Sequence, residues 1–279
     1  MIVTDKEYHM DDKLIAKLDL MIKRMTGNNK DDNVLPIDGD EGQGKTELAT
    51  GICYYVSDKT GRNYSVDNIF FDLQEGIKFA GQTSDQIIHF DEGALGLLRT
   101  QWQNKLQQQF IQLVMTARKK RHFIVICIPK FHRLPQYVIE ERSIGLVHVY
   151  SRNNMRKGSF AYFKRTAKDK LFQDWEKKKV KNYKKYHTFH GSFVQCMGKV
   201  FTDKQIQQYE DKKDAAIASI GNKDEKKDEW KQKTEELRSK VGNIPKVFGI
   251  DAEIFANYMK TNTRRLREWA KLNQNPEIS

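Results

Sequence analysis

The sequence predicts an α/β protein in which helices flank a sheet over residues ~30–165, followed by a small basic segment containing β-strands and by C-terminal helices. Short apolar runs alternate along the chain with segments whose apolar residues recur at helical intervals. Several of these runs are apolar throughout, which is typical of strands buried on both faces of a sheet. Together these observations favour a sheet covered by helices on both sides.

The individual elements follow from the same patterns. Helices are expected over residues 11–26, with Asp11 or Asp12 as the cap, over 47–56 and over 104–121. A strand followed by a helix is expected over 67–80. Strands are expected at residues 34–38, 69–72, 87–90, 123–128 and 145–150.

The composition changes after Ser151, and it divides the chain into four expected regions. They are a first domain over 1–165, a basic domain or linker over 166–201, a charged linker over 202–240 that is helical or flexible, and a small helical module over 241–279. Period-two patterns near 158–165 and 187–201 indicate β-structure. Gly249 followed by Asp251 resembles the turn of a helix-turn-helix. A helical cap or a protein-docking module is the alternative.

The positive charge is concentrated in one segment. The chain carries a net charge of +12, and residues 151–200 hold 14 basic and 3 acidic side chains. Such a segment is typical of contact with a polyanion, nucleic acid first, although a solvated surface is the alternative. We expect lysines and arginines there to meet backbone phosphates without reading bases. The candidates are Arg152, Arg156, Lys157, Lys164, Arg165, Lys177, Lys178 and Lys179.

A glycine-rich loop follows the first expected strand of the sheet. Residues 39–46, GDEGQGKT, fit the phosphate-binding pattern GxxxxGK[ST] and open a helix, which is the context that this motif requires. Glycines let the backbone turn its N–H groups toward phosphates, and the helix N-terminus adds its dipole. Lys45 is expected to reach the β- and γ-phosphates of ATP, and Thr46 to bind Mg²⁺. The nucleotide-binding candidates are Gly39, Asp40, Glu41, Gly42, Gln43, Gly44, Lys45 and Thr46.

Two acids follow the strand expected at 87–90. Asp91 is placed to hold Mg²⁺ through water, and Glu92 to polarise the attacking water. A helix N-cap is the alternative for such a pair, but the loop 45 residues upstream favours catalysis. His89, on the same strand, is expected to pack in the sheet.

The loop and the adjacent Asp-Glu together resemble the branch of P-loop NTPases with an additional strand and a catalytic glutamate. This resemblance implies that residues 123–128 form a strand inserted between the loop strand and the Asp-Glu strand. It also implies a polar sensor of the γ-phosphate at the end of that strand. The usual glutamine or asparagine is absent there, and Lys130 or His132 is the candidate substitute.

Four stretches make the chain similar to DNA-translocating ATPases of the FtsK/HerA type and to phage genome-packaging ATPases. They are GDEGQGKT, NIFFDLQEGIKFAGQTSDQIIHFDEG, MTARKKRHFIVICIP and PQYVIEERSIGLVHVY, covering ~120 residues. The resemblance implies a homo-oligomeric ring in which an arginine completes the site of the neighbouring subunit. Arg118, Arg121 and Arg142 are the candidates, and a helix C-terminal role is the alternative for the first two. Portal or capsid proteins are further candidate partners.

The expected function is therefore ATP-driven, Mg²⁺-dependent translocation of DNA, duplex preferred, to package a viral genome. One alternative is a regulatory or replication/transposition ATPase that binds a specific sequence. Another is a phage assembly ATPase resembling zonula occludens toxin, which normally needs a membrane anchor; none is expected here. Three widely spaced cysteines and the absence of a signal sequence favour a cytoplasmic location, in the host if the protein is viral.

Overall fold

The computed structural model describes residues 2–3, 8–27, 32–91, 105–152, 156–180, 182–194 and 196–271. Its contacts divide the chain into two compact units, Met1–Ala216 and Ile217–Ser279. The first unit holds a mixed sheet flanked by helices, and the second is helical. The expected α/β class is confirmed.

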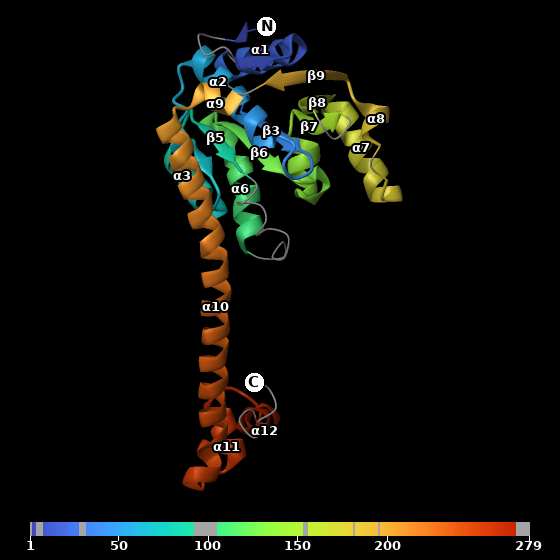
Figure 1. The fold of residues 1–279 in the computed structure, drawn as a ribbon. Coiled ribbons are helices and arrows are strands. Elements are labelled where there is room, and N and C mark those ends of the chain that lie inside the picture. Colours follow the sequence, from blue (N-terminus) through green and yellow to red (C-terminus); the bar gives the residue numbers. More distant parts are fainter. Residues whose placement is uncertain are drawn as a thin grey trace. The chain divides into compact units, whose positions relative to one another are not determined.

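The strands of the sheet follow one another across it in the order β1-β2-β9-β8-β7-β3-β6-β5-β4. Figure 1 labels six of them, β3, β5, β6, β7, β8 and β9. Their bounds are β1 Ile2–Val3, β2 Tyr8–Met10, β3 Asn33–Asp38, β4 Ile69–Phe70, β5 Ile87–Phe90, β6 Phe123–Ile128, β7 Gly145–Arg152, β8 Arg156–Lys164 and β9 Phe189–Val194. The five strands expected in the first domain therefore correspond to β3, β4, β5, β6 and β7.

The parallel half of the sheet has β6 at its centre. β6 pairs in parallel with β3 on one side and with β5 on the other, and β7 joins the far side of β3. Every residue of β3, β5 and β6 is buried, because helices cover both faces. The inserted position expected for residues 123–128 is thus observed. The carboxyl ends of β3 and β5 consequently lie at the same edge of the sheet.

The antiparallel half of the sheet is built from the basic segment. β8 pairs with β7 and with β9, and β9 pairs with β2 near the N-terminus. Residues 166–201, expected as a separate basic domain or linker, therefore belong to the first unit. Sequence alternation indicated the strands but could not indicate their partners, since pairing is a long-range property.

Helices pack on the two faces of the sheet, and each face has its own apolar core. The helices α1, α2, α9 and the start of α10 contribute to one core, and α3, α6 and α7 to the other. Asp11 caps α1 through its side chain, as one of the two expected caps. The bounds are α1 Asp12–Thr26, α2 Lys45–Thr60, α3 Leu73–Gln82, α6 Lys105–Lys120, α7 Arg165–Lys178, α8 Tyr183–Tyr186, α9 Cys196–Val200 and α10 Asp203–Phe248, with single-turn helices η1 Val66–Asn68, η2 Phe131–Arg133 and η3 Val138–Arg142.

The second unit contains α10 from Ile217 onward, then α11 (Ala252–Tyr258) and α12 (Thr263–Lys271). Gly249 ends α10 with a φ of 64°, and the Asp251 carboxylate caps α11 by accepting from two backbone N–H groups. Residues 252–258 and 263–271 are thus helical after a turn at Gly249, and the charged stretch from Asp203 onward lies in α10. Within the described residues, no helix combines the length and apolarity needed to cross a membrane.

Candidate active site

The loop between β3 and α2 requires glycine. Gly39, Gly42 and Gly44 have φ angles of 151°, 72° and 97°, a region that L-residues rarely adopt. A Cβ atom at Gly39 would lie only 2.3 Å from the carbonyl oxygen of Val149 on β7. The glycines thus have the conformational role expected of them, and the loop is held against the neighbouring strand.

Lys45 begins α2 and folds back over the loop. Its ammonium nitrogen donates hydrogen bonds to the carbonyl oxygens of Gly39 and Asp40, both at 2.9 Å, and the residue is 4% exposed. The same loop leads into the first turn of α2, whose N-cap Gly44 has no side chain to cap the backbone N–H groups. A buried ammonium group beside a helix N-terminus forms an arrangement suited to an anion.

Asp91 joins the loop to the neighbouring part of the sheet. The Thr46 hydroxyl donates to both carboxylate oxygens of Asp91, at 3.1 and 3.2 Å. The phenol of Tyr209, on α10, donates to Asp91 Oδ2 at 2.7 Å. Asp91 is 3% exposed, so its carboxylate is fixed by these partners. Glu92, the expected catalytic base, lies outside the described residues.

The Thr46 hydroxyl and the Asp91 carboxylate lie close enough together to hold one hard divalent cation between them. Mg²⁺ prefers oxygen ligands and keeps several of its waters, so it needs only one or two groups from the protein. Thr46 and Asp91 are the oxygen donors that the sequence indicated for this task, and the fold brings them together from positions 45 residues apart. Tyr209 was not anticipated, because an isolated tyrosine on a charged helix carries no pattern.

Asp38 is a second buried carboxylate, directly before Gly39. It accepts hydrogen bonds from His148 Nδ1 at 2.9 Å, from the Tyr183 phenol at 2.6 Å and from the backbone N–H of Phe131 at 3.3 Å. Asp38 thereby connects the start of the loop to β7, to α8 and to η2, which follows β6. The sequence patterns did not single out Asp38 as a site residue. Its position at the end of an apolar strand, like that of Asp91 directly after β5, was the signal that could have indicated it.

His89 is completely buried on β5, as expected for a packing residue. Its two ring nitrogens contact the Tyr64 hydroxyl at 3.0 Å and Cys127 Sγ at 3.4 Å. Burial lowers the pKa of His89, which favours the neutral ring. The ligand atoms of His89, Asp91 and Cys127 lie within 4.8 Å of one another, so the set is compatible with a metal ion. Because the ring nitrogens already have partners, these contacts favour packing.

The two sensor candidates lie just after β6 and behave differently. Lys130 is partly exposed and precedes η2. The His132 ring packs on Trp175 of α7, with ring centroids 4.0 Å apart. Because the His132 ring packs against α7, Lys130 is the better candidate for the sensor of the γ-phosphate.

The arginine candidates for a role in a neighbouring subunit have contacts within their own chain. Arg121 forms an ion pair with Asp85, and Arg142 with Asp32. Both lie just before the amino ends of β6 and β7, at the edge of the sheet opposite Asp38 and Asp91. They are therefore outside the loop site of their own chain. The side chain of Arg118 is outside the described part of the structure.

Five of the eight candidate DNA contacts have described side chains, and all five are exposed. They are Lys164, Arg165, Lys177, Lys178 and Lys179, on α7 and its flanks. Arg165 also donates to the carbonyl oxygens of Glu140 and Glu141. By contrast, Lys168 on the same helix is buried, and burial lowers its pKa. The side chains of Arg152, Arg156 and Lys157 are not among those described.

The sequence matches no protein-family model and no curated protein.

Proposed function

We propose that this protein is a Mg²⁺-dependent ATPase of the P-loop class that uses ATP hydrolysis to move DNA, in the setting of viral genome packaging. The observation that carries the proposal is the hydrogen bond between Thr46, at the start of α2, and Asp91, directly after β5, next to a loop that the ammonium group of Lys45 contacts. The position of β6 between β3 and β5 supports the additional-strand branch of this class.

In the proposed mechanism, each group at the loop has a separate task. Backbone N–H groups of the loop and Lys45 bind the phosphates, and Lys45 exchanges its contacts with the Gly39 and Asp40 carbonyls for phosphate oxygens. Thr46 and Asp91 would hold Mg²⁺, which would neutralise charge on the phosphates. Glu92 orients the attacking water, and an arginine from a neighbouring subunit stabilises the transition state.

The excess of exposed lysine and arginine on α7 supports a polyanionic cargo. Lysines contact phosphates without reading sequence, which suits a motor that must move any sequence. The test is displacement of streptavidin from end-biotinylated DNA in the presence of ATP, for several unrelated sequences in duplex and single-stranded form. We expect displacement of all of them. A Glu92→Gln variant should retain bound ATP and displace none.

The second candidate is a regulatory ATPase that binds one DNA sequence. It is favoured by the helical module of the second unit, where a turn at Gly249 precedes α11 and where α12 carries Arg264, Arg265 and Arg267. Protection of one specific sequence from nuclease digestion, without streptavidin displacement, would select this candidate instead.

The subunit-bridging arginine has its own test. Mixtures of Arg118→Ala and Lys45→Ala subunits should recover ATPase activity above either pure variant, because a mixed ring forms some sites with both groups intact. A mixture in which Arg121→Ala replaces Arg118→Ala provides the comparison, because Arg121 forms an ion pair with Asp85 of its own chain. No recovery in the Arg118 mixture would remove that residue from the mechanism.

A further inference from the structure

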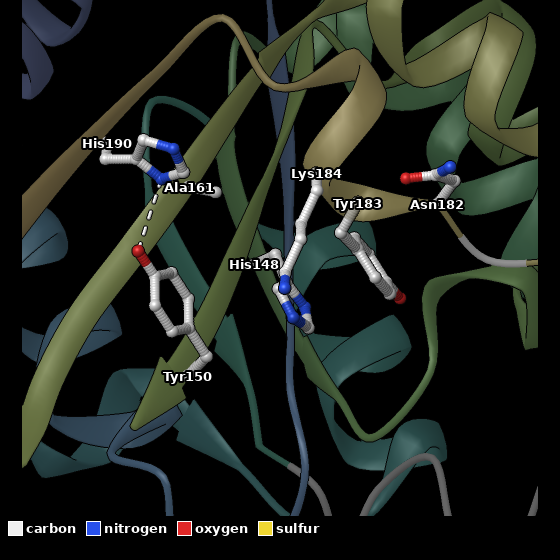
Figure 2. Close-up of a pocket in the computed structure, with 7 residues that line it drawn as sticks. All are labelled: His148, Tyr150, Ala161, Asn182, Tyr183, Lys184 and His190. Atoms are coloured by element: carbon white, nitrogen blue, oxygen red, sulfur yellow. Dashed lines mark hydrogen bonds between the residues drawn. The ribbon is translucent and has the colours of Figure 1, made fainter. Parts of the chain in front are cut away.

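A cavity of about 410 Å³ lies in the first unit, on the antiparallel half of the sheet (Figure 2). Its volume falls in the range typical of small-ligand pockets, roughly 300–1,000 Å³. Strands β7, β8 and β9 and the α8 region supply its walls. The lining residues are His148, Tyr150, Ala161, Asn182, Tyr183, Lys184 and His190.

The space exists because a small residue occupies the middle strand. Ala161 on β8 is paired with His148 on β7 and with His190 on β9, so its methyl group lies between two rings. A larger side chain at this position would fill the hollow.

Aromatic rings fix the shape of the walls. The rings of His148 and Tyr183 stack, with centroids 3.7 Å apart and an interplanar angle of 11°. Both side chains form hydrogen bonds with the buried Asp38 carboxylate. Burial and the Asp38 charge raise the pKa of Tyr183, so its phenol stays neutral. The Tyr150 hydroxyl forms a hydrogen bond with His190 Nδ1 at 3.2 Å. The pocket therefore offers preorganised ring surfaces.

Among the described residues that line the pocket, none is an acid. Lys184 and Asn182 are exposed beside the cavity, and Lys185 follows on α8. Ring surfaces next to ammonium groups complement a planar base attached to a phosphate chain.

We propose that this cavity receives an unpaired nucleobase of a DNA strand, whose adjacent phosphates meet Lys184 and the neighbouring lysines. The inference rests on the proposed function, and it specifies the cargo as DNA with a single-stranded region. Base stacking on aromatic rings is tolerant of sequence, because every base has an aromatic face.

The base of an ATP molecule at the loop is a less suitable occupant. The core residues of α2, such as Leu48 and Ile52, belong to the apolar core on one face of the sheet. Ala161 belongs to the core on the opposite face, against which Tyr150 and Tyr183 also pack. Helix α2, whose first turn is proposed to hold the phosphates, therefore packs on the face of the sheet opposite the cavity.

The cavity also contacts the nucleotide loop through one residue. Asp38 binds both His148 and Tyr183 and is followed directly by Gly39. A base that displaces either ring would change the hydrogen bonds of Asp38. Strands that carry bases should therefore stimulate ATP hydrolysis more than strands that lack them.

The test compares two fluorescent probes by anisotropy at one ionic strength: a 20-nucleotide deoxythymidine strand and an abasic strand of equal length and charge. The wild-type protein should bind the base-bearing strand more tightly by roughly 5- to 150-fold, the range that one base–aromatic stack supplies. Ala161→Leu and Tyr150→Leu should each bring this ratio close to one and leave affinity for the abasic strand unchanged. Tyr54→Leu, a partly buried tyrosine packed in the other core, is the matched control and should keep the ratio.

Equal wild-type affinity for both strands would overturn the inference and leave the proposed function intact. Unchanged ratios in both cavity variants would overturn it as well. Displacement of the base-bearing strand by ATP in a Lys45→Ala background would instead assign the cavity to a nucleotide. Failure of the wild-type protein to bind either strand or a duplex would overturn the proposed function itself.

Discussion

Replacing Tyr209 by phenylalanine removes one hydroxyl group from the candidate active site and leaves the aromatic ring in place. The ring packs against Phe71, with centroids 5.3 Å apart, and the hydroxyl donates to Asp91 Oδ2 at 2.7 Å. Because Asp91 is 3% exposed, water cannot readily replace the lost donor. A hydrogen bond to a charged group contributes about 1.5–3 kcal/mol, and we expect the free energy of unfolding to fall by that amount.

The same substitution should weaken Mg²⁺ binding. Partners that orient a metal-binding carboxylate typically alter metal affinity or activity by roughly 10- to 100-fold when they are removed. Asp91 keeps its contact with Thr46, so we expect the lower end of this range, a rise of about tenfold in half-saturating Mg²⁺. The assay is Mg²⁺-dependent binding of a fluorescent ATP analogue, alongside urea unfolding followed by circular dichroism.

Tyr55→Phe provides the matched control. Its hydroxyl donates to the Asp19 carboxylate at 2.6 Å, and neither residue belongs to the loop site. This variant should lose stability but keep the wild-type Mg²⁺ dependence. If Tyr209→Phe retained the wild-type half-saturating Mg²⁺, the role assigned to Tyr209 would be refuted.

Two further predictions concern the loop and the response to acid. Gly39→Ala should lower the melting temperature and nucleotide affinity more than Gly42→Ala, because a Cβ atom at position 39 meets Val149 at 2.3 Å whereas one at position 42 meets nothing within 4 Å; equal melting temperatures would contradict this. His122 is buried, its Nδ1 accepts from the Gln86 N–H, and burial lowers its pKa from 6.5. Its contribution to stability should be complete above pH 6.5 and decline below it, by up to about 1.4 kcal/mol per pH unit. His122→Gln should flatten this decline in urea titrations, and identical slopes would argue against it.

Local patterns predicted most of the helices and strands in the first unit. The apolar run of β3, the glycine loop and the start of α2 follow one another within the sequence, so their arrangement could be foreseen. The parallel order around β6 was foreseen from the resemblance of the motifs. These features depend on contiguous residues or on a recurring spacing.

The remaining contacts could not be foreseen, because they join distant parts of the chain. Tyr209 and Asp91 are separated by 118 positions, and Tyr183 and Asp38 by 145. Neither tyrosine belongs to a recognisable motif. The pairing of β9 with β2 likewise depends on tertiary packing, which period-two alternation does not encode. The basic segment therefore looked like a separate region, although it completes the sheet.

The most direct test is the rate of phosphate release from ATP and Mg²⁺, measured with and without DNA, for the wild-type protein and for Lys45→Ala. We predict that the wild-type protein hydrolyses ATP, that DNA of unrelated sequences accelerates it, and that Lys45→Ala is inactive in both conditions. Wild-type phosphate release no faster than that of Lys45→Ala, with DNA present, would contradict the account.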